Sequence, residues 1–176
     1  MRKIFWAGMA IFLLAGCAAL GGLPEREQIY GKEPPVITDS FASKKMSPGD
    51  TWKVYIKASD PDGDMRQIIC TVEQAGMGSY PVTRVKIREG QEREFSGFLY
   101  LATSPTPELY HLQPTLTVEV KDKAGHLSKP VKFPLELNPR ATQENPPPGG
   151  TFQEAELGPI MVTLGSSASL GGAGSE

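Results

Sequence analysis

Residues 52–58 read Trp-Lys-Val-Tyr-Ile-Lys-Ala, and apolar side chains occupy every second position of this stretch. Lys53, Tyr55 and Lys57 stand between them. Successive side chains of an extended chain point to opposite faces, so a period of two indicates a strand with one face in a core. The stretch therefore predicts a β-strand that is buried on one side.

The same period of two recurs along the chain, separated by turn residues such as Ser47–Asp50 and Glu89–Gly90. Further strands are predicted at 36–38, 68–73, 83–88, 95–101, 116–121 and 131–137. Pro134 suggests an edge position for the last of them. Seven short strands without an amphipathic helix predict an all-β fold, a single immunoglobulin-like antiparallel β-sandwich over residues 35–138.

Two loops carry a resemblance to known modules. Residues 58–64 read Ala-Ser-Asp-Pro-Asp-Gly-Asp, and residues 120–128 read Val-Lys-Asp-Lys-Ala-Gly-His-Leu-Ser. Both phrases resemble loops of bacterial Ig-like, cadherin-like and fibronectin type III-like surface modules. The Cys…Trp…Cys arrangement of antibody domains is absent from the sequence, so the resemblance is to the broader sandwich group. It implies a domain that binds, spaces or presents rather than one that catalyses.

Four carboxylates in these loops form the candidate site, Asp60, Asp62, Asp64 and Asp122. In an Ig sandwich the loop after the second strand and the loop after the sixth lie at the same end. An oxygen-rich cluster there suits Ca²⁺. The helix-loop-helix calcium pattern is not met, because Met65 and Thr71 occupy its Gly and Glu positions. The alternative is that Asp-Pro-Asp-Gly serves only as turn chemistry.

The amino terminus predicts a secretory signal. Met1-Arg2-Lys3 is followed by twelve uncharged residues, Ile4–Ala15. As a helix these would cover only about 18 Å, too short for a bilayer core of roughly 30 Å. Leu14-Ala15-Gly16-Cys17 resembles the lipobox of bacterial lipoproteins, which implies cleavage before Cys17 and acylation of that residue. The alternative is an uncleaved signal anchor that continues to Leu23.

The predicted organisation is therefore a signal peptide (1–16), a lipid-anchored tether (17–34), the sandwich (35–138) and a Pro/Gly/Ser-rich, largely disordered tail (139–176). Within the tail, residues 160–164 have strand character and are an alternative candidate for pairing with a sheet edge. Ala18 follows the acylated Cys, and in Gram-negative lipoproteins this favours the outer membrane.

Other residues give weaker indications of chemistry. The formal net charge of −2 gives no support for nucleic-acid binding. Cys70 lies in a strand pattern and is predicted to be a buried hydrophobe. His111 and His126 are distant in sequence, and no catalytic or zinc motif accompanies them. Asp122 and His126 are interpreted as a solvated turn.

Two exposed groups are alternative binding faces: a basic one of Arg84, Lys86 and Arg88, and an aromatic one of Tyr55, Phe98 and Tyr100.

The sequence thus favours a lipid-anchored cell-envelope protein whose Ig-like domain is a non-catalytic interaction or accessory module. Its partners would be the membrane through Cys17 and an envelope protein or polysaccharide, with no cofactor required. Two alternatives stay open: a calcium-dependent adhesion or surface-binding module, and a carbohydrate-binding accessory domain or carbohydrate-acting enzyme.

Overall fold

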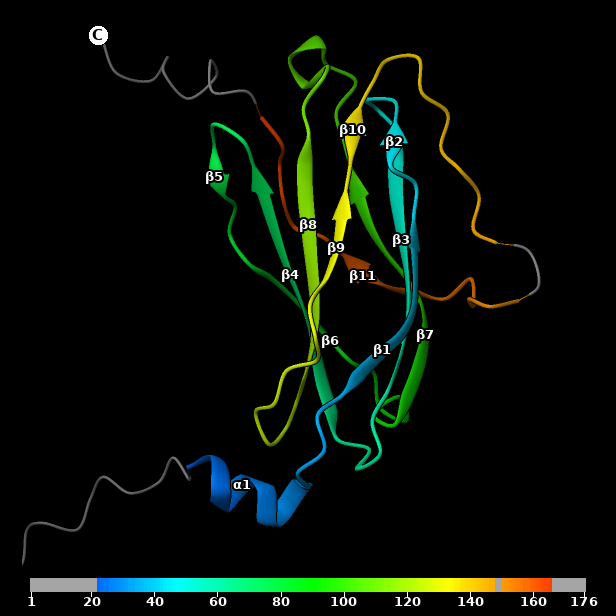
Figure 1. Ribbon diagram of the computed structural model, residues 1–176. Helices are drawn as coiled ribbons and strands as arrows, with labels where there is room; N and C mark the ends of the chain where they lie inside the picture. The colour runs from blue at the N-terminus through cyan, green and yellow to red at the C-terminus, as the bar shows by residue number, and fades with distance from the viewer. Residues whose placement is uncertain (1–21, 148–149, 166–176) are drawn as a thin grey trace, which may run out of the picture.

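Two β-sheets lie face to face in the computed structural model, which describes residues 22–147 and 150–165 (Figure 1). The first sheet has the order β1 (Val36–Ala42), β3 (Thr51–Ser59), β7 (Glu94–Ala102) and β11 (Glu156–Pro159). The second has the order β5 (Gly78–Ser79), β4 (Met65–Gln74), β8 (Pro114–Asp122) and β9 (Val131–Pro134), and β6 (Thr83–Lys86) also pairs with β4. A small third pair joins β2 (Lys45–Met46) to β10 (Glu136–Leu137).

The first six predicted strands correspond to β1, β3, β4, β6, β7 and β8. The last, predicted over 131–137, is divided into β9 and β10, and β10 pairs with β2 instead of β8. The pairings among the first six strands and β9 are antiparallel, as in β3 with β7, where Thr51 lies opposite Ala102 and Ser59 opposite Glu94. β9, which contains Pro134, lies at the edge of its sheet. The predicted all-β, immunoglobulin-like sandwich is therefore confirmed. Two short pairings, β10 with β2 and β11 with β7, are parallel, whereas the predicted sandwich was antiparallel.

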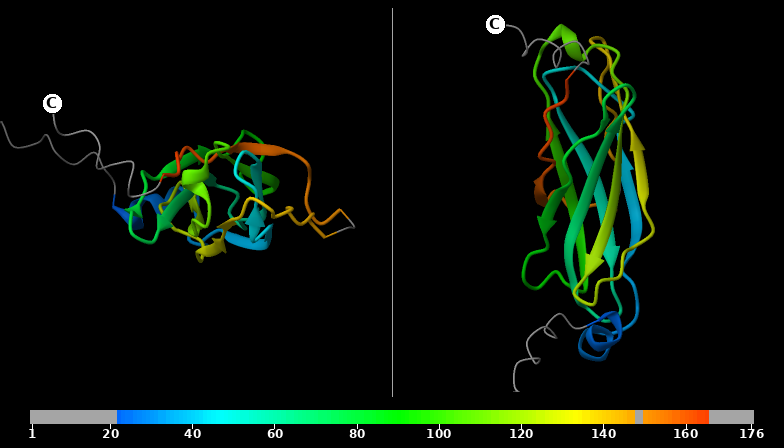
Figure 2. Two further views of the ribbon diagram at one scale, coloured as in Figure 1. Left: turned by 90° about the horizontal axis from the view of Figure 1, so that it is seen from above. Right: turned by 90° about the vertical axis from the view of Figure 1, so that its left-hand side faces the viewer.

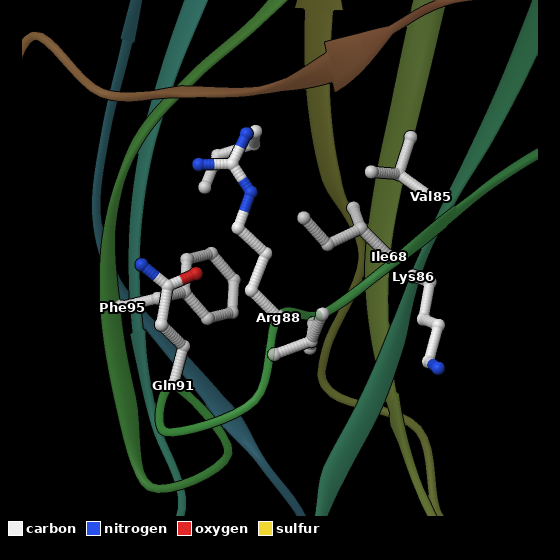
Figure 3. A pocket seen from close by; sticks show the side chains of 8 residues that line it. Ile68, Val85, Lys86, Arg88, Gln91 and Phe95 are labelled. Carbon is white, nitrogen blue, oxygen red and sulfur yellow. The ribbon is translucent and has the colours of Figure 1, made fainter.

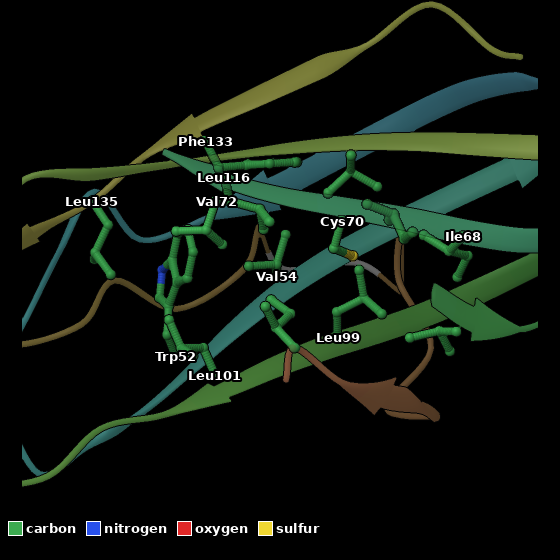
Figure 4. Close-up of a cluster of buried hydrophobic side chains, with 14 of the residues drawn as sticks. Trp52, Val54, Ile68, Cys70, Val72, Leu99, Leu101, Leu116, Phe133 and Leu135 are labelled. Atoms are coloured by element: carbon green, nitrogen blue, oxygen red, sulfur yellow. The ribbon is translucent and has the colours of Figure 1, made fainter. Parts of the chain in front are cut away.

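The core lies between the sheets and follows from the alternation seen in the sequence (Figure 4). One sheet contributes Trp52, Val54 and Leu99, and the other contributes Ile68 and Cys70; all five are buried. The Trp52 indole also donates a hydrogen bond to the Ser43 carbonyl at 2.8 Å. Burying each aliphatic side chain is worth about 1.5–3 kcal/mol, so the interdigitated faces hold the two sheets together. Cys70 is a buried free thiol, as predicted.

The segment after the sandwich returns to the first sheet and adds a strand to its edge. The sequence predicts a largely disordered tail from residue 139, but the structure places Glu156–Pro159 beside β7 as strand β11. The Ile160 amide donates to the Tyr100 carbonyl at 2.7 Å, and Ile160 is buried. Gly97 permits this approach, because a Cβ there would lie 2.3 Å from the Ala155 carbonyl oxygen. Residues 148–149 and 166–176 of the predicted tail lie outside the described residues.

Before β1, a short helix lies at one end of the sandwich (Figure 2). Helix α1 spans Leu23–Tyr30, within the predicted tether, and starts with Pro24 in its first turn, where the missing N–H costs nothing. None of its residues is buried. The predicted signal peptide, Cys17 and residues 18–21 lie outside the described residues. Among the helices described, none has the length and apolar character needed to cross a bilayer.

Candidate metal centre

The β3–β4 loop is built around the first of the four predicted carboxylates. Asp60 directly follows β3, and its Oδ1 accepts hydrogen bonds from the amides of Asp62 at 2.9 Å and Gly63 at 3.3 Å. This is the turn that the Asp-Pro-Asp-Gly sequence favours. Gly63 has φ of 75°, a left-handed conformation that glycine adopts without strain. The loop therefore uses one oxygen of Asp60 and leaves the other for a different partner.

The β8–β9 loop contributes Asp122, the last residue of β8. Its Oδ1 accepts hydrogen bonds from the amides of Gly125 and His126, the latter at 2.7 Å. Gly125 has φ of 117°, so the tight turn requires glycine here too. The loop thus closes around the carboxylate and fixes its orientation.

Asp64 joins the two loops. It lies immediately before β4, and its Oδ2 accepts hydrogen bonds from the amides of Lys123 at 3.1 Å and Ala124 at 3.3 Å, both in the β8–β9 loop. The Lys123 amide also donates to the Asp64 carbonyl at 3.0 Å. The two acidic loops are therefore fastened to each other at one end of the sandwich, the end where α1 lies (Figure 1).

Asp60, Asp64 and Asp122 form a buried cluster. One oxygen from each lies within 4.8 Å of one from each of the others. The exposed fractions are only 1%, 6% and 1%. Burial, together with the charges of Asp122 and Asp60, raises the pKa of Asp64 from 3.8 to about 6. The three carboxylates are therefore shielded from water and repel one another at short range.

Two oxygens of the cluster lack a hydrogen-bond donor among the described residues, Asp60 Oδ2 and Asp64 Oδ1. The other oxygens of these two side chains are the ones held by the loop amides. In the described part of the chain, the three carboxylates form an ion pair only through Asp122, which pairs with His126. A buried carboxylate oxygen without a partner is costly, and such groups in folded proteins call for an explanation.

Asp62, the fourth predicted residue, is not part of the cluster. It is exposed, and its Oδ2 accepts a hydrogen bond from the Glu33 amide at 2.9 Å. A Cβ on Gly31 would collide with the same carboxylate. In the alternating pattern Asp60, Asp62, Asp64 the middle carboxylate contacts the segment after α1 instead of the cluster. The structure thus brings together three of the four predicted carboxylates, and Asp62 holds the connection between α1 and β1.

His126 extends the cluster towards helix α1. Its Nδ1 lies 2.8 Å from Asp122 Oδ2, and its Nε2 lies 3.1 Å from Glu27 Oε1 of α1. The hydrogen bond with Glu27, followed by that with Asp122, raises the pKa of His126. The histidine side chain is only 16% exposed, which corrects the prediction of a solvated turn. Glu27 was not predicted, because nothing in the sequence indicates that α1 lies against this loop.

The other two candidate binding faces are the basic one and the aromatic one. Arg84, Lys86 and Arg88 are exposed, as interpreted from the sequence. Tyr55, expected to be exposed, is buried because its ring packs on Phe152 at 5.6 Å between centroids and its hydroxyl donates to Glu154 at 2.8 Å. Tyr55 was expected to be exposed because the residues that bury it, Phe152 and Glu154, belong to the C-terminal segment, which was predicted to be largely disordered.

Two of the concave regions formed by the described residues lie near the candidate sites. An open cleft of about 500 Å³ lies between α1 and the acidic loops and is lined by Glu25, Arg26, Ile29, Tyr30, Arg66 and Lys123. A gap of about 10 Å³ between the sheets lies near Ile68 and Phe95, and Arg88 and Gln91 border it (Figure 3). The gap has room for one water molecule at most. Neither region contains the three clustered carboxylates.

No family model matches the chain, and no curated protein matches it. Among solved structures, the chain is similar to the PKD domain of an M14-like peptidase from a Thermoplasmatales archaeon, with a TM-score of 0.35 and 15% identity. The match covers 60% of this chain and 96% of that domain.

Proposed function

We propose that this protein is a lipid-anchored protein of the bacterial cell envelope, in which the Ig-like sandwich is a non-catalytic interaction or accessory module. The observation that carries the proposal is Leu14-Ala15-Gly16-Cys17, which directly follows a charged start and an apolar run. Acylation of Cys17 with two or three chains would hold the protein stably, because one chain alone gives only marginal membrane binding.

The spacing between anchor and fold supports a domain held close to the membrane. Five residues, 18–22, separate Cys17 from the first residue of α1. Because an extended chain advances at most about 3.5 Å per residue, α1 could lie no further than roughly 20 Å from the acylated residue. The acidic loops, which contact α1, would then belong to the membrane-proximal end, and the opposite end would face away from the bilayer.

Anchoring is tested by replacing the acylated residue. Cells expressing wild type or Cys17→Ser are grown with labelled palmitate and then fractionated. The proposal expects label and membrane association for the wild type, and loss of both for Cys17→Ser. A Cys70→Ser variant is the matched control and should keep both. A Cys17→Ser protein that stays in the membrane fraction would contradict acylation and support the uncleaved anchor.

The interaction role is tested by cross-linking in intact cells, followed by purification under denaturing conditions. The proposal expects one envelope protein or polysaccharide to be recovered with wild type and to be reduced with the mislocalised Cys17→Ser protein. Recovery of no envelope component above the background of an untagged strain would count against an interaction module. Ala18 favours the outer membrane if the cell has one, and density separation of the two membranes tests this.

A further inference from the structure

The cluster of Asp60, Asp64 and Asp122 has the composition and spacing of a single-cation site. All available ligands are oxygens, which is the donor set that Ca²⁺ takes at about 2.3–2.6 Å. Two oxygens bound to one such ion can be separated by up to roughly 5 Å, twice that bond length. The separations between the clustered oxygens are at most 4.8 Å. Even at that limit one ion could lie about 2.8 Å from all three carboxylates, so a closure of a few tenths of an ångström would bring all three within bonding distance.

The two oxygens without donors point to the same conclusion independently of the charge. Asp60 Oδ2 and Asp64 Oδ1 are buried and have no hydrogen-bond donor in the described part of the chain. Their partner oxygens are already fixed by amides, so rotation of either carboxylate would only exchange which oxygen is left over. A bound cation would satisfy both oxygens and offset the repulsion among three buried negative charges.

We propose that Asp60, Asp64 and Asp122 bind one Ca²⁺ ion that joins the β3–β4 and β8–β9 loops, and that Asp62 is not a ligand. Mg²⁺ suits the site less well, because it keeps several waters and the cluster is almost fully buried. Backbone oxygens or water complete the six to eight ligands that Ca²⁺ takes. The site does not depend on lipid anchoring, so it stands or falls separately from the proposed function.

The test is isothermal titration of the detergent-purified protein, stripped with chelator at neutral pH, with CaCl₂. The expected result is one site with a Kd of roughly 0.1–1 mM, the range of extracellular modules, and a melting temperature several degrees higher at saturation. Asp64→Asn should weaken binding at least tenfold. Asp62→Asn, a change of the same chemistry in the same loop, should leave the affinity within about twofold.

The absence of both heat and a melting shift at millimolar Ca²⁺ in the wild type would overturn the proposal without any variant. Equal loss of affinity in Asp62→Asn and Asp64→Asn would also overturn it, because it would place the ion elsewhere on the loop. If Asp64→Asn does not fold, Asp122→Asn replaces it. Titration with MgCl₂ alone should give at least tenfold weaker binding, and tighter binding of Mg²⁺ would refute the assignment to Ca²⁺.

Discussion

His126 Nδ1 lies 2.8 Å from Asp122 Oδ2, so this histidine is joined directly to the buried carboxylate cluster. Its second ring nitrogen faces Glu27 of α1 at 3.1 Å. The helix buries none of its own residues. Among the described residues, two polar contacts connect this region to the acidic loops: Glu27 with His126, and the Glu33 amide after the helix with Asp62.

Removing the helix side of this contact should free α1 without unfolding the sandwich. In Glu27→Ala, we expect faster hydrogen exchange across residues 23–30. The free energy of unfolding should change by less than about 1 kcal/mol, because partly exposed ion pairs contribute little. Glu25→Ala, on the same helix, is the control and should leave the exchange unchanged. Equal exchange rates in Glu27→Ala and wild type would show that α1 is held by something else.

The raised pKa of Asp64 predicts that the cation-free protein becomes less stable as pH rises from about 4 to 6. Between the unfolded value of 3.8 and the folded value of about 6, the folded state binds more protons than the unfolded state, so each rise in pH favours unfolding. The free energy of unfolding should fall by about 3 kcal/mol over this range, because a difference of one pKa unit between the folded and unfolded states is worth about 1.4 kcal/mol.

Denaturant unfolding in chelator at several pH values measures this dependence. Other carboxylates also titrate in this range, so the relevant quantity is the difference between wild type and Asp64→Asn. The stability of the variant relative to wild type should rise from pH 4 to pH 6 and then level off. A difference that does not change with pH would contradict the raised pKa.

Gly97 should be necessary for the return of the C-terminal segment. In Gly97→Ala the new Cβ would meet the Ala155 carbonyl oxygen at 2.3 Å, which is backbone and cannot move aside easily. We expect β11 to detach, with faster hydrogen exchange at residues 156–164 and a stability loss of about 1–3 kcal/mol, typical of overpacking. Gly22→Ala is the control, because its Cβ would meet only Pro24 at 3.6 Å. Native exchange at residues 156–164 in Gly97→Ala would mean that close approach of the C-terminal segment to Gly97 does not hold β11 in place.

Cys70 should be inert in the folded protein. Burial raises the pKa of its thiol to about 12, so almost none of the reactive thiolate exists at neutral pH. Ellman's reagent applied to Cys17→Ser protein should give no signal until denaturant is added, and then one thiol per chain. Rapid labelling of the native protein would show that the core around β4 opens readily.

The strands were predictable because their information is local. In β3 and β8 the alternation of apolar and polar residues is dictated by which face packs on the opposite sheet. The three clustered carboxylates were predictable for a topological reason, since the loops holding Asp60, Asp64 and Asp122 lie at the same end of any Ig-like sandwich. The exclusion of Asp62 was not, because it depends on where Glu33 happens to lie.

Helix α1 was not predicted, and for strand β11 the sequence indicated only an alternative, edge pairing a few residues further on, at 160–164. Both elements lack such local information. Helix α1 has no apolar stripe in its sequence, Leu-Pro-Glu-Arg-Glu-Gln-Ile-Tyr, and only Pro24 marks its start. Strand β11 contains Gly158 and Pro159 and is four residues long. It exists because β7 offers an unpaired edge and Gly97 leaves space, and both conditions lie more than 50 residues away in sequence.

Backbone amide NMR spectra, recorded while Ca²⁺ is added to chelator-stripped protein, test the cation site most directly. The account predicts saturable shifts at Gly63, Asp64 and residues 122–126, smaller changes in α1 through His126 and Glu27, and none at Ser47–Asp50, a turn remote from the acidic loops. Spectra that stay unchanged at millimolar Ca²⁺, or that change first at exposed acidic residues such as Asp39, would contradict it.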